Sequence, residues 1–319
     1  IKHTKHTVKF LILLYKYILR KNFASHQPMS SSIRISLVAL GSYGREQLCI
    51  YSDIDIMLLY ENVKGYNLKN IMEEFITLAW DCGLKLGSRV HELKEISDAV
   101  KEDITIKSSI LESRLIYGSK NLWFGYQNVL SKIRKTNQKE FVLDKLEEHK
   151  QRLLKYPLKM EPNIKDGYGG IRESNMMYWM ANILYGVTNT KDLIGKQFTE
   201  EEYKKYRQAL EFIFQVRNAL HNIARKKQDQ VTFDILPDLS TKLGFVNKPR
   251  HTKDRQCMSK LLSTLHIIHN FTATMVKKFT RQVLFEASNI PKLKELRYKK
   301  NLYIIDNKLF CSFNTTPQT

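Results

Sequence analysis

Two aspartates separated by one residue, Asp53 and Asp55, are the best candidates in this sequence for metal-dependent chemistry. They stand at the start of the apolar run 54–60, which predicts a β-strand whose alternate side chains point to the same face. Both carboxylates therefore face one side, with Cα atoms roughly 6.6 Å apart. Such a pair can hold two Mg²⁺ ions, because Mg²⁺ prefers oxygen ligands and shares them with phosphates. Two metal ions would stabilise the attacking and the leaving oxygen of an in-line displacement at phosphorus.

A short turn upstream of the aspartates is suited to binding phosphate. Gly41 and Ser42 follow the apolar run 33–40, which predicts another strand. A glycine lets a backbone amide approach a phosphate closely, and amides in such a turn form a small anion-binding concavity to which the Ser42 hydroxyl adds a donor. Arg45 adds a planar, permanently charged partner for phosphate oxygens. A lone D-x-D motif is often a solvated turn, but a preceding G-S turn makes the pattern much more specific.

A second glycine-rich segment, 163–172 (NIKDGYGGIR), carries two cations. Lys165 and Arg172 lie on either side of three glycines, which include Gly169 and Gly170. A flexible loop of this kind can close over a triphosphate, because positioning and charge neutralisation dominate phosphoryl-type transfer. The alternative is a tight interdomain turn with solvated cations.

Three histidines are further candidates. His221 lies four residues after Arg217, so both share one face of a predicted helix. A nucleotide contact and a satisfied core histidine are equally good interpretations of His221. His266 and His269 also share a helix face, and because no carboxylate lies near them in the sequence we interpret the pair as structural.

The elements predicted around these residues divide the chain into an α/β part and a helical part. Strands are predicted at 33–40, 54–60 and 84–93, and helices at 8–19 and 68–81. From about residue 97 onward the pattern is helical, with helices at 139–156, 199–225 and 254–287. Thr199 and Glu202 form a capping box, which predicts where the second of these helices begins.

Composition limits the class of protein. The 319 residues include 52 Lys and Arg and 32 Asp and Glu, for a net charge of +20, and 43% are hydrophobic. The length suggests two domains, each able to bury a core, and the apolar content excludes disorder over the whole chain. The charge fits either a polyanionic partner or a Lys-rich solvated surface. Four widely separated cysteines indicate reduced thiols in a cytoplasm. The apolar segment 8–19 is too short to span a bilayer and is interpreted as an amphipathic helix on the first domain.

The G-S turn followed by the D-x-D strand resembles the signature of the DNA polymerase beta-like nucleotidyltransferase superfamily. The segment GSYGREQLCIYSDIDIMLLY is similar to the G-G-Y-G-R-G-E-L-x-P-x-S-D-I-D-L-L-L segment of bacterial PII uridylyltransferases. Further stretches resemble that family in the same order, namely LAWDCGLKLGSRV, DITIKSSILESRLIYG, EPNIKDGYGGIRESNMMYWMANILYG and VRNALHNIARKKQDQVTFD. The resemblance covers most of the chain to about residue 287.

The resemblance implies an α+β fold. A polymerase beta-like nucleotidyltransferase domain with a small mixed sheet is expected at 1–125, an all-helical domain at 126–290, and the start of a truncated C-terminal region at 291–319. The superfamily commonly uses a third carboxylate from a later strand as the base for the acceptor hydroxyl. Glu92 and Asp103 are the candidates here, and the sequence does not decide between them or show that a third carboxylate is needed.

The resemblance also implies the reaction. We expect UMP transfer from UTP to a tyrosine of a PII nitrogen-regulatory protein, with release of pyrophosphate, in the cytoplasm and without a membrane or nucleic-acid partner. The uridylyl-removing activity is expected to be absent, because no His-Asp dipeptide of the family's HD domain occurs in the chain. An RNA nucleotidyltransferase, favoured by the charge, is one alternative. A non-catalytic remnant that binds PII or a nucleotide is another, because the third carboxylate is uncertain.

Overall fold

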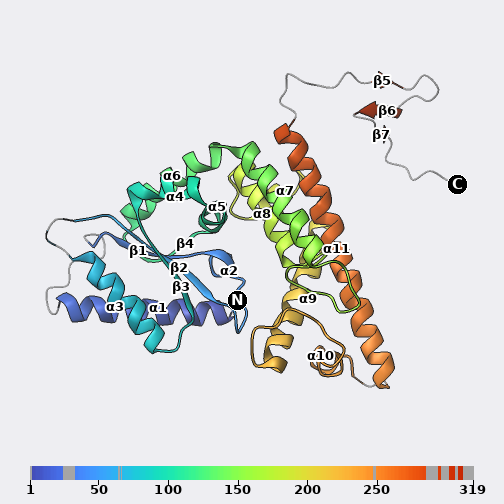
Figure 1. Cartoon of the computed structure of the whole chain (residues 1–319), viewed down its shortest axis with the longest axis horizontal. Coiled ribbons are helices and arrows are strands. Elements are labelled where there is room, and N and C mark those ends of the chain that lie inside the picture. Colours follow the sequence, from blue (N-terminus) through green and yellow to red (C-terminus); the bar gives the residue numbers. More distant parts are fainter. Residues whose placement is uncertain are drawn as a thin grey trace.

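The computed structural model describes residues 2–23, 33–63, 65, 67–246 and 249–284. Beyond these it gives the backbone of three short strands, β5 (Lys294–Glu295), β6 (Leu302–Ile305) and β7 (Lys308–Cys311). The rest of the predicted region 291–319 lies outside the described residues. Figure 1 shows a sheet part at the left and a helical part at the right.

The sheet part is built on four strands in the order β3-β2-β1-β4. These are β1 (Ile35–Ala39), β2 (Ile54–Tyr60), β3 (Leu86–Glu92) and β4 (Arg114–Gly118). The sheet is mixed, because β1 is antiparallel to β2 and β4 whereas β2 and β3 are parallel. One helical turn, α2 (Gly41–Gly44), follows β1 at the position of the predicted G-S turn.

The other long elements of the described chain are helices. Those that surround the sheet are α1 (Lys2–Phe23), α3 (Leu68–Asp81), α4 (Ile96–Glu102), α5 (Ile104–Leu111) and α6 (Lys120–Lys135). Those of the helical part are α7 (Gln138–Lys155), α8 (Ile171–Tyr185), α9 (Glu200–Ala224), α10 (Leu236–Lys242) and α11 (Arg250–Leu284). Helix α8 is buried along most of its length and packs against α11, which also packs against α9.

Both faces of the sheet are covered, which explains why β1 and β2 are continuous apolar runs. On one face, residues such as Leu37 and Ile56 form a core with α1 and α3. On the other face, Met57 belongs to the core of the helical part. Asp53 and Asp55 have the same parity as Met57, so they point toward the helical part.

The fold class and most elements agree with the sequence-based predictions. Strand β2 and helix α3 have the predicted bounds, and α1 packs against α3 as an amphipathic helix. The capping box of Thr199 and Glu202 is present at the start of α9. The prediction that the chain is helical from about residue 97 onward is wrong, because β4 completes the sheet. Among the described residues, none of the helices is both long enough and apolar enough to cross a membrane.

Candidate active site

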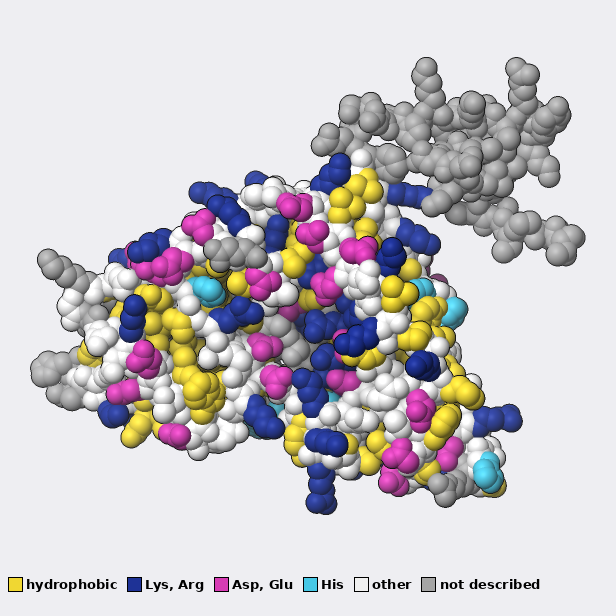
Figure 2. All heavy atoms as spheres, in the orientation of Figure 1, with side chains coloured by type: hydrophobic (Ala, Val, Ile, Leu, Met, Phe, Trp, Pro, Cys, Tyr) yellow, Lys and Arg dark blue, Asp and Glu magenta, His cyan; other side chains and the backbone are white. Residues whose placement is uncertain are grey.

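A cavity of about 420 Å³ opens between the sheet part and the helical part. It brings together residues predicted from distant segments, namely Gly41, Ser42, Arg45, Asp53, Asp55, Lys165 and Arg172. Figure 2 shows Lys and Arg side chains gathered in the hollow between the two parts. Four predicted site residues, all of which the structure describes, do not line this cavity: Glu92, Gly169, Gly170 and His221.

The Asp55 carboxylate is kept accessible by a glycine on each side. A Cβ on Gly87, its neighbour on β3, would lie 2.6 Å from Asp55 Oδ1, and a Cβ on Gly41 would lie 3.0 Å from Oδ2. Burial raises the pKa of Asp55, and the charge of Asp53 raises it further. Because Gly41 and Gly87 have no side chains, space remains beside the Asp55 carboxylate. A cation in that space would relieve the repulsion between Asp55 and Asp53.

The two aspartates suit a hard cation such as Mg²⁺. They offer only oxygen ligands, and a bound cation would relieve the repulsion between them. Lys227 Nζ, 3.0 Å from Asp53 Oδ2, supplies positive charge there. Within the described part of the chain, no group of three or more His, Cys, Asp or Glu side chains is arranged to hold a metal ion. Further ligands would therefore come from substrate phosphates and water, as is usual for Mg²⁺.

Glu92 lies away from this site. In the parallel register of β2 and β3, Asp55 pairs with Gly87, whereas Glu92 pairs with Tyr60 at the other end of the strands. Five residues of strand separate the two positions by about 16 Å, and their odd spacing points the side chains to opposite faces. Glu92 instead contacts Lys94, at 3.0 Å.

A different carboxylate, Glu112, faces the aspartates. It follows α5 directly, is buried, and lines the cavity. Its Oε1 accepts hydrogen bonds from Arg45 Nη1 and Trp179 Nε1. Its Oε2, which has no hydrogen-bond partner among the described residues, lies on the side of Gly41, where a Cβ would be 3.8 Å away. Because the same point is 3.0 Å from Asp55 Oδ2, Glu112 and Asp55 approach Gly41 together.

Arg45 serves mainly to hold Glu112 in this structure. Its Nε donates to Gln47 Oε1 at 3.0 Å, and Nη1 donates to Glu112. Burial raises the pKa of Glu112, although the Arg45 charge lowers it. The phosphate contact predicted for Arg45 stays a prediction, although Arg45 lines the cavity.

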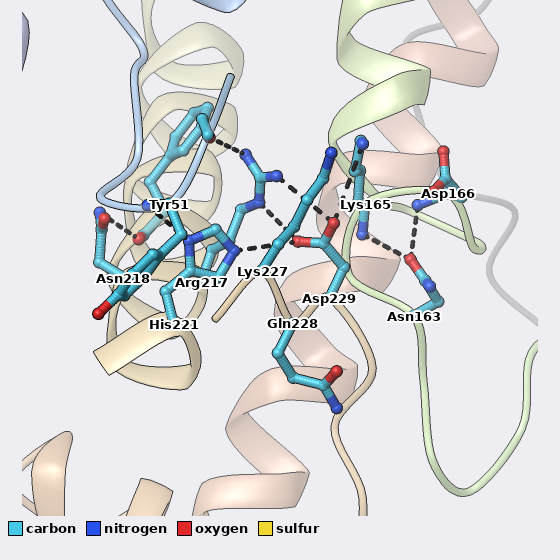
Figure 3. A network of polar contacts seen from close by, with 12 residues as sticks. Tyr51, Asn163, Lys165, Asp166, Arg217, Asn218, His221, Lys227, Gln228 and Asp229 are labelled. Carbon is cyan, nitrogen blue, oxygen red and sulfur yellow. Dashed lines mark hydrogen bonds and ion pairs between the residues drawn. The ribbon is translucent and has the colours of Figure 1, made fainter. Parts of the chain in front are cut away.

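Asp229 is the centre of a polar network that joins the cations of the cavity (Figure 3). Arg217 Nε donates to Asp229 Oδ1 at 2.6 Å, and Lys165 Nζ lies 3.9 Å from Oδ2. His221 Nε2 lies 3.6 Å from Oδ1. Burial alone would raise the pKa of Asp229, but His221, Arg217 and Lys165 together hold it well below its usual range. Asp229 therefore stays ionised and fixes cations from two segments.

The same helix, α9, also holds the segment that enters β2. His221 Nδ1 accepts a hydrogen bond from the Tyr51 backbone at 3.4 Å, and Asn218 Oδ1 accepts one from Ile50 at 3.3 Å. The His221 side chain is fully buried. The His221 side chain thus lies between Asp229 and the backbone that precedes Asp53, and it helps to hold that backbone in position.

The glycine-rich segment 163–172 is tightly packed, in contrast to the flexible loop expected from its composition. Asn163 Oδ1 accepts hydrogen bonds from the backbone of Lys165 at 3.0 Å and of Asp166 at 2.7 Å. Gly169 has a φ of +64°, and a Cβ there would overlap the carbonyl oxygen of Leu265 on α11. Glycine is required at this position by close approach, so Lys165 and Arg172 are presented by a fixed turn.

The aromatic and histidine residues beside this turn lock it to α11. The Tyr168 ring stacks on His269, with ring centroids 3.9 Å apart. His269 Nδ1 lies 3.0 Å from Oε2 of Glu173, a buried residue of α8 whose Oε1 accepts from the Gly169 backbone. The structural interpretation of His269 agrees with this packing, and its carboxylate partner comes from a residue 96 positions away.

The cavity as a whole suits a polyanion bound through metal ions. Six Lys and Arg side chains line it, against four carboxylates, two of which are the aspartates suited to a cation. Sequence reasoning missed Lys145, Lys227, Asp229 and Glu112, which lie outside the glycine and D-x-D motifs. Long side chains of these types give no local pattern, so only the fold brings them to the site.

Comparison with known proteins shows the family to which the chain belongs. Residues 140–276 match the family model described as GlnD PII-uridylyltransferase. The chain is 32% identical over 266 residues to the bifunctional uridylyltransferase/uridylyl-removing enzyme of Pseudomonas fluorescens (strain SBW25), which covers 82% of the chain and 30% of that enzyme. It is 31% identical over 259 residues to the enzyme of the same name from Azotobacter vinelandii (strain DJ / ATCC BAA-1303), covering 80% of the chain and 29% of the relative.

A third relative of the same name, from Ectopseudomonas mendocina (strain ymp), is 34% identical over 220 residues, or 68% of the chain and 24% of the relative. The chain thus spans about 30% of the length of the curated relatives that it matches. The matched residues include both the sheet part and the helical part that line the cavity. The chain belongs to the family of bacterial PII uridylyltransferase/uridylyl-removing enzymes.

Proposed function

We propose that this chain is a nucleotidyltransferase that transfers UMP from UTP to a tyrosine hydroxyl of a PII-type protein and releases pyrophosphate. The observation that carries the proposal is the pair Asp53 and Asp55, which face a cation-rich cavity of about 420 Å³ from one face of β2. The names of the relatives supply the uridylyl group and the PII acceptor. The reaction would take place in the cytoplasm.

Asp53 and Asp55 would hold two Mg²⁺ ions, which when bound neutralise charge on the α-phosphate and on the leaving pyrophosphate. The Ser42 hydroxyl and the backbone amides of α2 would bind phosphate oxygens. Lys165 and Arg172, presented by the fixed turn, would bind the other phosphates from the helical part. In this arrangement the triphosphate is bound between the two parts, so its reacting phosphorus is oriented before the acceptor arrives.

We assign the proton transfer to Glu112. The tyrosine oxygen forms a bond to the α-phosphorus, the bond from that phosphorus to the bridging oxygen breaks, and the hydroxyl proton passes to Glu112 Oε2. The geometry supports this role of Glu112, because Arg45 and Trp179 hold its Oε1 and its Oε2 points toward Gly41. Burial raises the pKa of Glu112, which favours proton uptake.

The proposal is tested by incubating the chain with each of the four α-³²P-labelled nucleoside triphosphates, Mg²⁺ and either a PII protein or tRNA. The expected result is label on PII from UTP only, abolished by chelation of the metal. Label on tRNA would instead show an RNA nucleotidyltransferase. Binding of UTP or PII with no transfer under any of these conditions would show a non-catalytic binding protein.

A further inference from the structure

The hydroxyl groups on one wall of the cavity present only hydrogen-bond acceptors. This wall is formed by α5, where Ser108 and Ser109 line the cavity. Ser108 Oγ donates to the Ile104 carbonyl and Ser109 Oγ to the Thr105 carbonyl, each at 2.9 Å. A hydroxyl has one proton, so both serines have only lone pairs left for a ligand. Phosphate oxygens are also acceptors, so they cannot form hydrogen bonds with these two serines.

Asn175 of α8 lines the same cavity and has an unused amide. Its side chain is buried, with 8% of the residue exposed. Within the described part of the chain its amide makes no hydrogen bond, and the residue lines the cavity. An amide that faces a cavity without a protein partner is suited to a ligand that both donates and accepts.

Among the described cations that line the cavity, Arg172 is the one that shares helix α8 with Asn175. Arg172, Asn175 and Trp179 share one helix face, because they are three and then four residues apart. Lys165, Arg217 and Lys227 are paired with Asp229 or Asp53 instead. The cavity therefore has a cationic wall around Asp229 and Asp53, and a second wall, formed by α5 and α8, where neutral acceptors and one amide lie beside Arg172.

We propose that Ser108, Ser109 and Asn175 bind the base of the nucleotide and select uracil through its imide edge. Uracil presents an N3–H donor beside the O4 acceptor, and an amide oxygen and amide nitrogen pair with these two groups. The Asn175 amide can rotate to pair with either pyrimidine, so the discrimination comes from the two serines, whose lone pairs accept from the uracil N3–H and repel the lone pair at cytosine N3. The inference rests on the proposed nucleotidyl transfer and deepens it, since it names residues that choose the nucleotide.

Equilibrium binding by titration calorimetry, with Mg²⁺ and without any acceptor protein, tests this inference. The ligands are UTP, CTP and inorganic triphosphate. The wild-type chain should bind UTP about tenfold or more tightly than CTP, because a buried polar group left unpaired weakens binding by about that factor. Asn175→Ala should lose about tenfold in UTP affinity and keep its affinity for inorganic triphosphate.

Two further variants give the test its controls. Asn175→Asp keeps an acceptor but loses the donor to O4, so it should shift the UTP-to-CTP affinity ratio toward CTP. Lys165→Ala, on the cationic wall, should weaken UTP and inorganic triphosphate in proportion. Ser109→Ala, a change at a half-buried hydroxyl, should weaken UTP but not triphosphate, and it stands in if the Asn175 variants fail to fold.

Equal affinity of the wild type for UTP and CTP would overturn the inference. So would an Asn175→Ala chain that binds UTP as tightly as wild type or loses triphosphate binding equally. Selective UTP binding by a chain that labels no PII would refute the transfer reaction and leave the assignment of Asn175 standing. A chain that binds none of the three ligands would refute both.

Discussion

Arg217 Nε donates a hydrogen bond of 2.6 Å to Asp229 Oδ1, and this buried ion pair fixes the segment that follows α9 against that helix. The two side chains are 6% and 11% exposed. Arg217 Nη1 also donates to Ser52 Oγ at 3.4 Å, next to Asp53. Arg217, held by Asp229, thus connects the helical part with the entry to β2, as Figure 3 shows from close by.

Asp229→Ala should therefore lower the free energy of unfolding by about 3–5 kcal/mol, because it leaves the Arg217 charge buried and unpaired. Urea unfolding followed by circular dichroism measures this. Asp81→Ala, at an exposed aspartate at the end of α3, is the matched control and should change stability by less than about 0.5 kcal/mol. Equal effects of the two variants would show that the pair does not stabilise the fold.

The same pair predicts a pH dependence. The folded pKa of Asp229 lies below its usual range, so its contribution to stability is present above about pH 4 and is lost as the pH falls toward the folded pKa. The difference in unfolding free energy between wild type and Asp229→Ala should be largest at neutral pH and shrink below about pH 4. A difference that stays constant from pH 7 to pH 3 would contradict the role given to the ionised carboxylate.

Glu112→Gln and Glu92→Gln distinguish the carboxylate that the structure places at the site from Glu92, which was a candidate from the sequence. If Glu112 Oε2 takes the proton, Glu112→Gln should lower kcat for PII labelling by about 10²–10⁴-fold, while the neutral amide still accepts from Arg45 and Trp179. Glu92→Gln should leave kcat close to wild type, because this residue lies at the other end of β3. Steady-state kinetics with varied UTP give both values. The reverse outcome would return the role to Glu92.

Gly87→Ala should impair transfer by displacing the Asp55 carboxylate. The added Cβ would lie 2.6 Å from Asp55 Oδ1, so the carboxylate must turn away from the position that the cation needs. A displacement of about 1 Å in such a site costs on the order of 10²-fold in rate. Gly125→Ala in α6 is the control, because its Cβ meets only the end of the Leu93 side chain. Labelling rates that are the same for both variants would show that Gly87 is not needed for access.

The parts of the site that the sequence predicts are those in which chemistry is encoded locally. Asp53 and Asp55 needed only strand periodicity to be placed on one face, and the G-S turn before them falls at α2. Strand β4 was missed because its five half-buried residues follow a helix directly and pair with β1 through an irregular register. A short strand of this kind gives no alternation long enough to recognise.

Glu112 and Asp229 could not be predicted, because their roles depend on contacts between distant segments. Glu112 meets Arg45 across 67 positions, and Lys227 meets Asp53 across 174. The expectation for Glu92 rested only on its position in a predicted strand. The register of β3 against β2 places Glu92 at the end of β3 that is distant from Asp55. The glycines of the segment 163–172 were expected to give flexibility, but the packing of Gly169 against Leu265 shows that they allow close approach.

The central claim is tested most directly by labelling of PII from α-³²P-labelled UTP, with wild type compared with the Asp53→Asn, Asp55→Asn double variant. Lys101→Gln, at an exposed salt bridge on α4, is the matched control for loss of a surface charge. Wild type and the control should label PII at equal rates, and the double variant should show none although it folds. Labelling retained by the double variant would contradict the account, because the proposed transfer requires metal ions held by Asp53 and Asp55.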